Sequence, residues 1–550
     1  MTRFGLVLLA LAGCQVPDDV ALGSETSASQ SEDCEWTQWG RSAAHDSRSC
    51  ARAQPLDTLL AHRTLDPLVV EDEDPYRGSF AHIQVPLSDN DGNVFVMSKS
   101  GIYGEPSTYV WYEKGLHWEH GELVERWSFT SDWRPSPLAR PDGALFQAAL
   151  SGRWIWVPGA GGTLHKIEKG TGQVRERVNP FGNAIDPDTY IHGGITADGD
   201  GNIFYNAVKF AATNPRTSDI QGAWLVRISP RGDVRLVDYR TLVPGAPAPT
   251  DPCYLTFAAI QPRPPGPWPP VTPELPPQAA CLSQRPPLET TPAVGADGTI
   301  YVLSRAHAND RYSYMVALRP DLELRWATSM RDLLDDGCGE LAFCRPGATP
   351  GVDPETNLLP APQASDAPSS APLPLPDGGV AFGAVTSYNG GRGHLMKFDR
   401  DGAFAGSFDF GWDMTPGLWE HDGTYSLIVK DNYYNEGIYY VTQINADLEE
   451  EWEFEATNTF SCERLPDGTI ECEDFGWPFE WCIASPGIDR DGTVYVGSAD
   501  GNLYGIAQGG VEHARYFMDR TVFAAYTPTA IDGRGRVQAM NNGQLFVVGR

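Results

Sequence analysis

Asp491-Gly492-Thr493-Val494-Tyr495-Val496-Gly497-Ser498 is the stretch of sequence that decides the fold of this chain. Its Asp-Gly pair is typical of a tight turn, because glycine adopts a positive φ at little steric cost. The residues that follow are rich in Val and Tyr, which favour a β-strand buried on one or both faces. The stretch therefore predicts a turn that leads directly into a buried strand.

The same pattern recurs along nearly the whole chain. A short strand, often starting near a proline, precedes several of the turns, so we expect each turn to join the first strand of a repeating unit to the second. Including the weaker matches, the sequence holds eight copies. Besides the copy at 491, they begin at Asp91, Asp200 and Asp297 (close copies), Asp142, Asp377 and Asp422 (weaker copies) and Asp532 (a degenerate copy).

A third and a fourth strand are expected in each unit, and the fourth often carries a Trp or another bulky residue after a small turn. The expected fourth strands cover residues 123–129, 174–178, 234–242, 322–328, 404–410, 448–454 and 511–517. Four short strands repeated about eight times predict an all-β fold, a β-propeller of about eight four-stranded blades. Two stacked β-sandwiches with similar turns are the alternative.

The two ends of the repeat array favour a closed ring. After Asp532 only about two strands remain, at 537–540 and 544–548, so the last blade lacks its fourth strand. Residues 59–65 precede the first unit without partners and resemble residues 237–242, including a shared Arg-Thr-Leu. We expect residues 59–65 to complete the last blade, which removes exposed sheet edges. Stacked sandwiches do not explain this extra strand.

The composition excludes one class of partner. Hydrophobic residues make up 41% of the 550 residues and charged residues 21%, which is enough for a packed core. Asp and Glu outnumber Lys and Arg by 72 to 41, so the formal net charge is −31. Because such a chain repels phosphate backbones, nucleic acid is not an expected partner.

The first residues are typical of a targeting signal. An apolar run at 4–12 is too short to span a bilayer as a mature helix. Leu11-Ala12-Gly13-Cys14 resembles the lipobox of bacterial lipoproteins, which implies a signal peptide at 1–13, lipidation of Cys14 and attachment to a membrane of the cell envelope. The residue after Cys14 is Gln15 and not Asp, and in that resemblance this implies that the lipoprotein is sorted to the outer membrane. An ordinary cleaved secretory signal is the alternative.

Residues 14–33, rich in Ser, Thr, Asp and Glu, indicate a flexible tether ahead of a propeller at 34–550.

Three long insertions interrupt the repeats. The insertions, at 243–289, 331–369 and 456–483, each lie between the fourth strand of one blade and the next blade, so they should gather on the face opposite the Asp-Gly turns. Long loops on a rigid scaffold are common binding sites, and drift in tolerated surface loops is the alternative.

Cysteines gather in these insertions and around the start of the propeller, where an exported protein can form disulfides. Proximity predicts bridges between residues 34 and 50, 253 and 281, and 338 and 344, and one pair among the last three cysteines, which leaves one thiol unpaired. The candidates are Cys34, Cys50, Cys253, Cys281, Cys338, Cys344, Cys462, Cys472 and Cys482.

Residues 491–506 resemble the pyrroloquinoline-quinone-type repeats of a β-propeller family. The fourth-strand Trp residues support the resemblance, as does Trp36-Thr37-Gln38-Trp39-Gly40-Arg41 with His45, which is similar to the opening segment of such propellers. The resemblance covers roughly residues 35–550 and implies the fold, not an activity. The family includes quinone-dependent alcohol dehydrogenases and non-enzymatic members such as the propeller lipoprotein of the outer-membrane β-barrel assembly machinery. Its enzymes carry a disulfide between adjacent cysteines, and no two cysteines here are neighbours.

We find no catalytic or metal-binding motif in the sequence. Stretches of the form Asp-x-Asp-Gly resemble the start of a calcium loop, but counting from Asp89 and Asp198 reaches Ser100 and Lys209, where an EF-hand needs Glu. We interpret them as plain turns. Aromatic residues in loops of the insertion face are suited to stacking on sugars or gripping a peptide, and packing beneath the loops is the alternative. These candidates are Tyr388, Tyr433, Tyr434, Trp477 and Trp481.

Together these features favour a non-catalytic, lipid-anchored propeller of the cell envelope that binds a protein or glycan and needs no cofactor. The first alternative is a quinone-dependent oxidoreductase, which would require pyrroloquinoline quinone and calcium. The second is a purely structural envelope scaffold.

Overall fold

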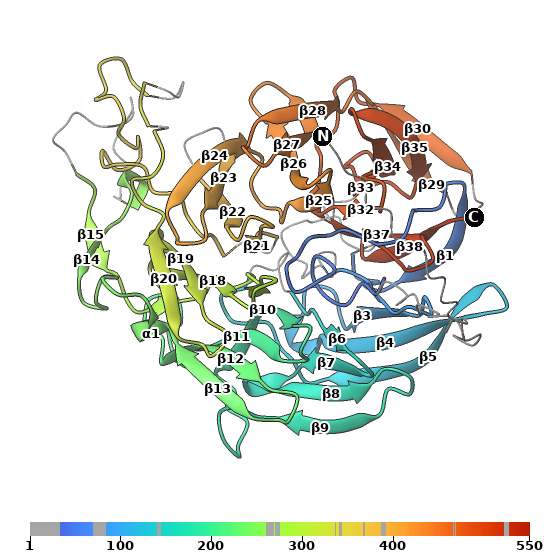
Figure 1. The fold of residues 1–550 in the computed structure, drawn as a ribbon, viewed down its shortest axis with the longest axis horizontal. Helices are drawn as coiled ribbons and strands as arrows, with labels where there is room; N and C mark the ends of the chain where they lie inside the picture. The colour runs from blue at the N-terminus through green and yellow to red at the C-terminus, as the bar shows by residue number, and fades with distance from the viewer. Residues whose placement is uncertain are drawn as a thin grey trace, which may run out of the picture. The chain divides into compact units, whose positions relative to one another are not determined.

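The predicted Asp-Gly turns, with the exception of the copy at Asp142, join the first and second strands of four-stranded antiparallel sheets in the computed structural model (Figure 1). The structure describes residues 34–69, 84–139, 145–259, 269, 275–335, 337–339, 344–366, 369–386, 392–465, 467, 469–521 and 527–550. The predicted signal peptide, Cys14 and the tether lie outside these residues. Cys34–Arg550 is one unit with its own contacts.

Eight such sheets follow one another as the blades of a ring, numbered here in chain order (Figure 1). Blades one to three are formed by β2 (Leu87–Ser88), β3 (Val94–Ser100), β4 (Val110–Glu119) and β5 (Glu122–Ser131); β6 (Ala149–Ser151), β7 (Trp154–Pro158), β8 (Leu164–Glu168) and β9 (Val174–Val178); and β10 (Thr189–Ala197), β11 (Ile203–Lys209), β12 (Gly222–Ile228) and β13 (Val234–Asp238). Blades four and five are formed by β16 (Gln284–Arg285), β17 (Ala293–Val294), β18 (Ile300–Ala306), β19 (Asn309–Leu318) and β20 (Leu324–Ser329); and β21 (Leu373–Pro374), β22 (Val380–Val385), β23 (Gly393–Phe398) and β24 (Phe404–Phe410).

Blades six and seven are formed by β25 (Gly417–His421), β26 (Thr424–Tyr433), β27 (Ile438–Asn445) and β28 (Glu450–Glu455); and β32 (Gly487–Ile488), β33 (Val494–Gly497), β34 (Asn502–Ala507) and β35 (Val511–Phe517). Blade eight is formed by β36 (Thr527–Ile531), β37 (Val537–Asn541), β38 (Gln544–Gly549) and β1 (Thr58–Thr64), with β31 (Ile483–Ser485) paired in parallel to β36. The insertions add β14 (Pro252–Tyr254), β15 (Gln278–Ala280), β29 (Phe460–Arg464) and β30 (Ile470–Asp474). The helical turns are η1 (Pro106–Thr108), η2 (Ala160–Gly162), η3 (Phe257–Ala259) and α1 (Tyr239–Leu242).

The N-terminal strand closes the ring, as the sequence predicts. β1 pairs antiparallel with β38, from Thr58 opposite Gly549 to Thr64 opposite Gln544. The alternative of two stacked sandwiches is therefore wrong. The reason for the prediction was only partly right, because Arg240-Thr241-Leu242, the stretch that β1 resembles, lies in α1 and not in a strand.

Two local predictions are wrong. The turn that joins β6 to β7 is centred on Gly152, which has a φ of 58°, and not on the copy at Asp142, which lies outside the described residues ahead of β6. The predicted fourth strand at 234–242 ends at Asp238, because the Asp238 side chain accepts a hydrogen bond from the Arg240 amide and begins α1.

The blades bury their middle strands and expose their outermost ones. β11 is buried along nearly its whole length, whereas β35 is exposed at Val511 and over most of its first half. Large apolar side chains of neighbouring blades pack against each other between the sheets, where they form the core clusters. This arrangement follows from alternation along each strand, with one face turned to each neighbouring blade.

Tryptophans of the fourth strands connect one blade to the next. The Trp127 indole Nε1 of β5 donates a hydrogen bond to the Lys169 carbonyl in the β8–β9 turn, at 2.9 Å. The Trp326 Nε1 of β20 donates to the Arg400 carbonyl in the β23–β24 turn, at 3.0 Å, and its ring lies against Gly402. The Trp signal that identified fourth strands in the sequence is thus a contact between blades. Among the described residues, no helix is long and apolar enough to cross a membrane.

Candidate functional site

The centre of the ring is crossed by residues 36–54, here called the central segment, which appear as the dark blue chain in Figure 1. It contacts the innermost strands of the blades in chain order. Trp36 and Ser88 of blade one exchange two backbone hydrogen bonds, of 2.9 and 3.0 Å. Leu150 of blade two donates to the Thr37 carbonyl at 2.7 Å, and Ala197 of blade three donates to the Gln38 side chain at 2.6 Å.

The contacts continue around the remaining blades. They are Val294 N to Ala43 O at 2.7 Å, His45 Nδ1 to Pro372 O at 2.9 Å, Leu418 N to Asp46 O at 2.8 Å, Ile488 N to Ser47 O at 2.9 Å and Gln54 N to Gly535 O at 2.7 Å. The central segment therefore satisfies inward-facing backbone groups of all eight blades, next to the Asp-Gly turns. A disulfide joins Cys50 of this segment to Cys34, two residues before its start.

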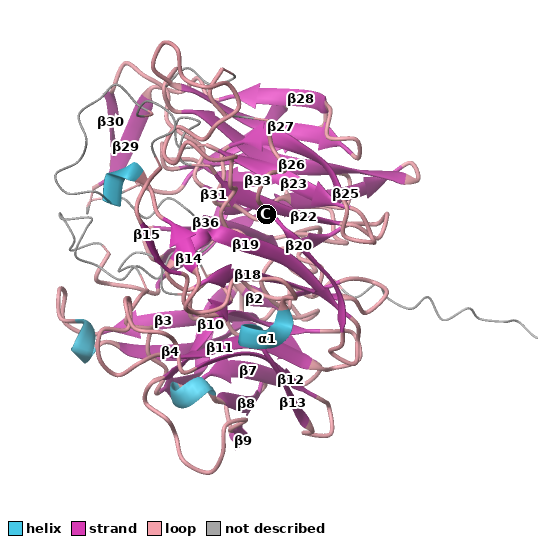
Figure 2. Ribbon diagram, turned by 90° about the vertical axis from the view of Figure 1, so that its left-hand side faces the viewer, coloured by secondary structure: helices cyan, strands magenta, loops and turns pink. Residues whose placement is uncertain are grey.

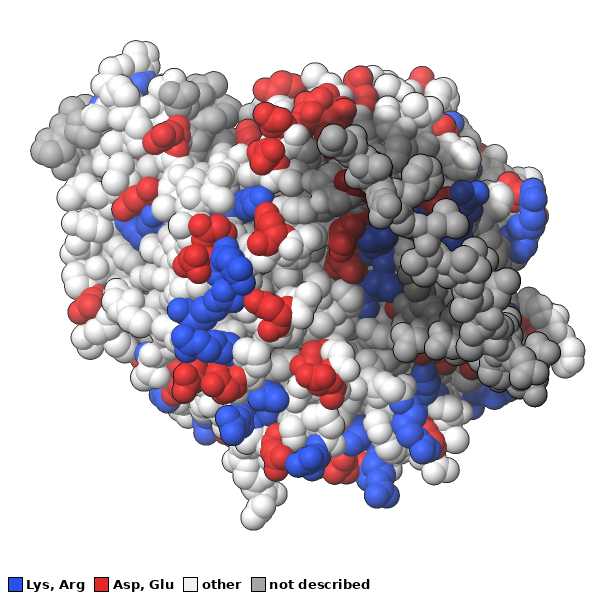
Figure 3. All heavy atoms as spheres, in the orientation of Figure 1, with Lys and Arg blue, Asp and Glu red and all other residues white. Residues whose placement is uncertain are grey.

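The side of the ring that carries the Asp-Gly turns, here called the turn face, offers few free groups to a ligand. The central segment occupies the middle of the ring there, and burial lowers the pKa of His45 to about 4 despite its hydrogen bond to Pro372, so its imidazole is neutral. Several turn aspartates are already paired, for example Asp377 with Lys397 at 2.8 Å and Asp297 with Arg325 at 3.3 Å. Figure 3 shows Lys and Arg side chains next to Asp and Glu over much of the surface seen in that view.

The three insertions lie between fourth and first strands of consecutive blades, and Figure 2 shows β14, β15, β29 and β30 together on one side of the blades. We call this side the insertion face. The first two insertions contact each other, since Phe257 N donates to the Glu355 carbonyl at 2.9 Å and Arg345 Nε donates to the Pro269 carbonyl at 2.6 Å.

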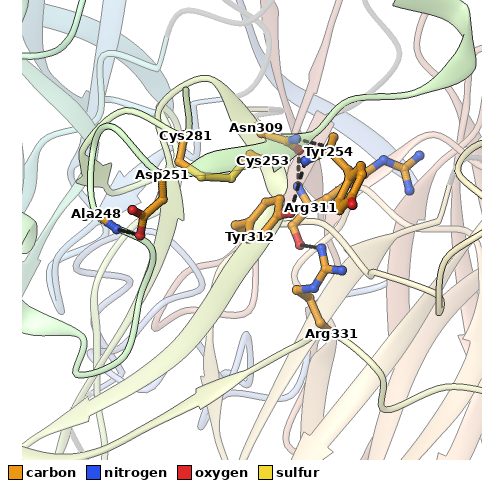
Figure 4. Close-up of a disulfide and its surroundings, with 9 residues drawn as sticks. All are labelled: Ala248, Asp251, Cys253, Tyr254, Cys281, Asn309, Arg311, Tyr312 and Arg331. Carbon is orange, nitrogen blue, oxygen red and sulfur yellow. Dashed lines mark hydrogen bonds between the residues drawn. A yellow bond between two sulfur atoms is a disulfide. The ribbon is translucent and has the colours of Figure 1, made fainter. Parts of the chain in front are cut away.

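The first insertion is also tied to the rim of blade four (Figure 4). Its β14–β15 ribbon is closed by the disulfide between Cys253 and Cys281. Asn309 Nδ2 donates to the Tyr254 carbonyl at 2.6 Å, and Tyr254 N donates to the Tyr312 hydroxyl at 3.2 Å. These contacts fix the described part of the first insertion against the start of β19.

The third insertion forms a disulfide-closed hairpin. Cys462 of β29 lies directly opposite Cys472 of β30, and the two form a bridge. A fourth bridge joins Cys338 to Cys344 in the second insertion, while Cys482 is buried and unpaired. The structure thus contains disulfides between the neighbouring cysteines that proximity indicated.

The aromatic candidates fall into different environments. Trp477 is 63% exposed beside Phe475, with ring centroids 6.2 Å apart. Trp481 is fully buried and packs against Tyr504, with ring centroids 5.1 Å apart, so it belongs to the core and not to a binding surface.

Two tyrosines lie between these extremes. Tyr433 is half-buried beneath the Arg392 guanidinium, which lies 3.5 Å from its ring centroid, and Tyr434 packs beside Tyr439. Tyr388 lies outside the described residues. Of the described aromatic candidates, Trp477 alone presents most of its side chain to solvent.

The hairpin carries further exposed side chains that the sequence reasoning did not single out. Phe460, at its open end, and Ile470, beside its turn, are 48% and 47% exposed. Exposed carboxylates accompany them: Glu463, Glu471, Glu473 and Asp474. The apolar and acidic residues between 460 and 474 were the only sequence signal for an exposed surface. That signal could be interpreted only once the structure showed this stretch to be a hairpin separate from the blades.

Within the part of the chain that the structure describes, no three His, Cys, Asp or Glu side chains lie close enough together to hold a metal ion. The Asp-x-Asp-Gly stretches use their carboxylates locally, as in Asp489, whose Oδ1 accepts hydrogen bonds from Asp491 N at 3.0 Å and Thr493 N at 2.9 Å. These carboxylates stabilise turns.

Comparison with known proteins adds information on the fold. No protein-family model and no curated protein matches this chain in sequence. Among solved structures, quinohemoprotein alcohol dehydrogenase from Comamonas testosteroni is similar, with a TM-score of 0.52 and 11% identity over 94% of this chain and 81% of that one. The chain has the fold of the quinoprotein-type propellers.

Two other solved structures are similar to this quinoprotein-type propeller at lower scores. A europium-containing methanol dehydrogenase gives a TM-score of 0.48 and 10% identity over 92% of this chain and 89% of that one. BamB from Moraxella catarrhalis gives 0.42 and 13% identity over 90% of this chain and 99% of that one. At such identities the likeness concerns architecture, and an activity has to be argued from the site.

Proposed function

We propose that this chain is a non-catalytic, lipid-anchored propeller of the cell envelope that binds a protein partner through the insertion face. The observation that carries the proposal is the third insertion, whose disulfide-closed hairpin presents Phe460 and Ile470 to solvent and is followed by the exposed Trp477. Large apolar side chains left exposed on one segment cost free energy in an isolated protein and often mark interaction surfaces. A disulfide-closed hairpin presents them with little entropy left to lose on binding.

The charge of the hairpin narrows the kind of partner. Four exposed carboxylates lie on the same two strands as Phe460 and Ile470, so a partner with Lys or Arg residues next to apolar side chains is complementary. Trp477 would be the anchor, because tryptophan dominates the binding energy of protein interfaces. A glycan would instead use the aromatic rings and leave the carboxylates largely without a role.

The path of the chain supports this choice of face. Cys34 N donates a hydrogen bond to Asn90 Oδ1, at 3.1 Å, in the first Asp-Gly turn. The tether expected at 14–33 would therefore reach the propeller on the turn face. The insertion face lies on the other side of the blades (Figure 2), away from this attachment point.

The test is a capture and cross-linking experiment with envelope extracts. Wild type is compared with a Phe460→Ser/Ile470→Ser/Trp477→Ala variant and with Val511→Ser, which removes another exposed apolar side chain, 61% exposed, from an outer strand. We expect the same proteins to be captured by wild type and the Val511 control and lost with the triple variant. Capture that survives in the triple variant would refute the proposed surface, and loss after deglycosylation of the extract would indicate a glycan.

The non-catalytic part of the proposal has its own test. The purified protein is incubated with pyrroloquinoline quinone and calcium and assayed with an electron-accepting dye and primary alcohols. We expect no turnover above the protein-free control, and alcohol-dependent dye reduction would overturn this part. Labelling with radioactive fatty acid in cells, compared with a Cys14→Ser variant, tests the lipid anchor.

A further inference from the structure

A second feature of the insertion face is a cavity of about 470 Å³ between the first insertion and blades three and four. This volume lies in the range of small-molecule sites. Three arginines and one aspartate line it: Arg216 from the β11–β12 loop, Arg285 of β16, Arg305 of β18 and Asp366 from the second insertion. The charged side chains of its wall therefore sum to a positive charge in a chain whose net charge is −31.

Arg285 and Asp366 form the fixed part of this wall. The two guanidinium Nη atoms of Arg285 donate to the two carboxylate oxygens of Asp366, both at 2.8 Å, and the Arg285 side chain is 1% exposed. Leu288 N donates to the same carboxylate at 3.0 Å. Burial alone would oppose ionisation of Asp366, but Arg285 and Arg305 outweigh it and hold its pKa well below the usual value.

A neutral histidine completes the support. Arg285 Nε donates to His307 Nδ1 at 2.9 Å, so His307 Nε2 carries the proton and donates it to the Pro215 carbonyl, also at 2.9 Å. Burial, followed by the charge of Arg285, lowers the pKa of His307 to about 4. His307 therefore adds no charge to the cavity at neutral pH but fixes the plane of the Arg285 guanidinium.

The other two arginines differ in their contacts, and Arg305 Nε donates a hydrogen bond to the Ala306 carbonyl at 3.2 Å. Arg305 contacts Asp366 at 3.2 Å and the partly exposed Asp310 at 3.5 Å, both through Nη1. Arg216 is exposed at the rim and forms no hydrogen bond or ion pair with another residue of the described part of the chain. The two buried guanidinium groups, Arg285 and Arg305, face the carboxylates of Asp366 and Asp310, so the exposed Arg216 supplies the additional positive charge of the wall.

Apart from Thr217, the rest of the lining is apolar. Leu138, Leu255 and Leu282 contribute large side chains, and alanines of β15 and of the β18–β19 turn fill the space between them. An inorganic anion would use only the arginines. An organic anion with an apolar body would use both parts of the wall, because its hydrocarbon loses contact with water while its charge pairs with a guanidinium fork.

We propose that this cavity binds a small organic carboxylate, with the carboxylate between Arg305 and Arg216 and the apolar body on the leucine side of the wall. Arg285, held by Asp366 and His307, is a positioning residue that keeps the wall in shape. This site is separate from the hairpin of the third insertion, so it goes beyond the proposed function and stands or falls independently of it.

Calorimetric titration of the purified protein with octanoate tests the proposal, with octanamide and inorganic phosphate as probes of the two halves of the wall. We expect octanoate to bind more tightly than octanamide or phosphate. Its affinity should fall as the salt concentration rises from 50 to 500 mM, because salt screens the attraction between the carboxylate and the guanidinium groups. Arg216→Gln should weaken octanoate about tenfold, since a hydrogen bond to a charged group contributes about 1.5 kcal/mol or more.

The variants include controls for folding and charge. Arg216 is at the surface, so Arg216→Gln leaves the buried network intact, and Arg305→Lys keeps the charge while removing the fork. Arg319→Gln, at an exposed position remote in the fold, removes the same charge and should leave the octanoate affinity unchanged. Equal affinity for octanoate and octanamide, tighter binding of phosphate, or octanoate affinity unaffected by Arg216→Gln would each overturn the proposal. Loss of partner capture in the triple hairpin variant with unchanged octanoate binding would show the two sites to be independent.

Discussion

Neutralising Asp66 tests how the ring is held closed. Asp66 follows β1, the strand that completes blade eight, and its Oδ2 lies 2.7 Å from Lys99 Nζ at the end of β3 in blade one. The two side chains are 0% and 1% exposed. The ion pair therefore connects the last blade to the first in a region without solvent.

The expected cost follows from this burial. Asp66→Asn keeps the size of the side chain and an oxygen that can accept the Leu68 amide, now bonded to Asp66 Oδ1 at 3.1 Å. It removes the negative charge 2.7 Å from the buried Lys99 ammonium, which also lies 4.5 Å from the Tyr109 ring. Removing one partner of a buried pair costs about 3–5 kcal/mol in unfolding free energy.

The assay is urea unfolding followed by tryptophan fluorescence, with the unfolding rate as a second measure because large proteins need not unfold in two states. Glu323→Gln is the matched control, since it breaks the exposed pair with Arg319, 3.4 Å apart, and should cost less than about 1 kcal/mol. Asp66→Asn/Lys99→Met removes both charges and should recover much of the loss. A cost of Asp66→Asn no larger than that of Glu323→Gln would refute the reasoning, as would a double variant as unstable as Asp66→Asn alone.

Two further predictions concern the contacts between blades and the central segment. Gly402→Ala should destabilise the protein by at least about 1 kcal/mol more than Gly423→Ala. Both glycines have a positive φ, but a new Cβ at 402 would lie 2.5 Å from the Trp326 ring, whereas one at 423 would meet nothing within 4 Å. Equal unfolding midpoints of the two variants would contradict this. Since the pKa of His45 is lowered from 6.5 to about 4, its neutral form stabilises the fold above pH 6.5, and up to about 3 kcal/mol is lost as the pH falls from 6.5 to 4. His45→Asn should therefore show a smaller loss of stability than wild type over that range in unfolding measured at each pH, and an unchanged pH profile would contradict the assignment.

Local sequence patterns were sufficient for most of the architecture. A turn such as Asp491-Gly492 needs only its own residues to form, since the Asp489 carboxylate caps it and glycine supplies the positive φ. The strand predicted at 511–517 is the strand observed, because alternation and turn residues act over a few positions. At Asp238 one local signal overrode another, because the side chain caps a helical turn inside a segment that the apolar pattern predicted to be a strand.

The sequence by itself thus determined the repeat and the number of blades, which depend on residues near each other in the chain. It also indicated the closing strand, because the last repeat lacks a fourth strand and residues 59–65 have no partners beside them, although β1 and β38 pair across the whole length of the chain. Only the tertiary structure decided which aromatic side chain is available, since Trp477 and Trp481 are four positions apart yet one is exposed and the other is in the core. It also brought Arg216, Arg285, Arg305 and Asp366 to one cavity across 150 residues of chain, counted from 216 to 366. No local pattern encodes such a meeting, because the ring geometry, and not the spacing of these residues, sets the distances between them.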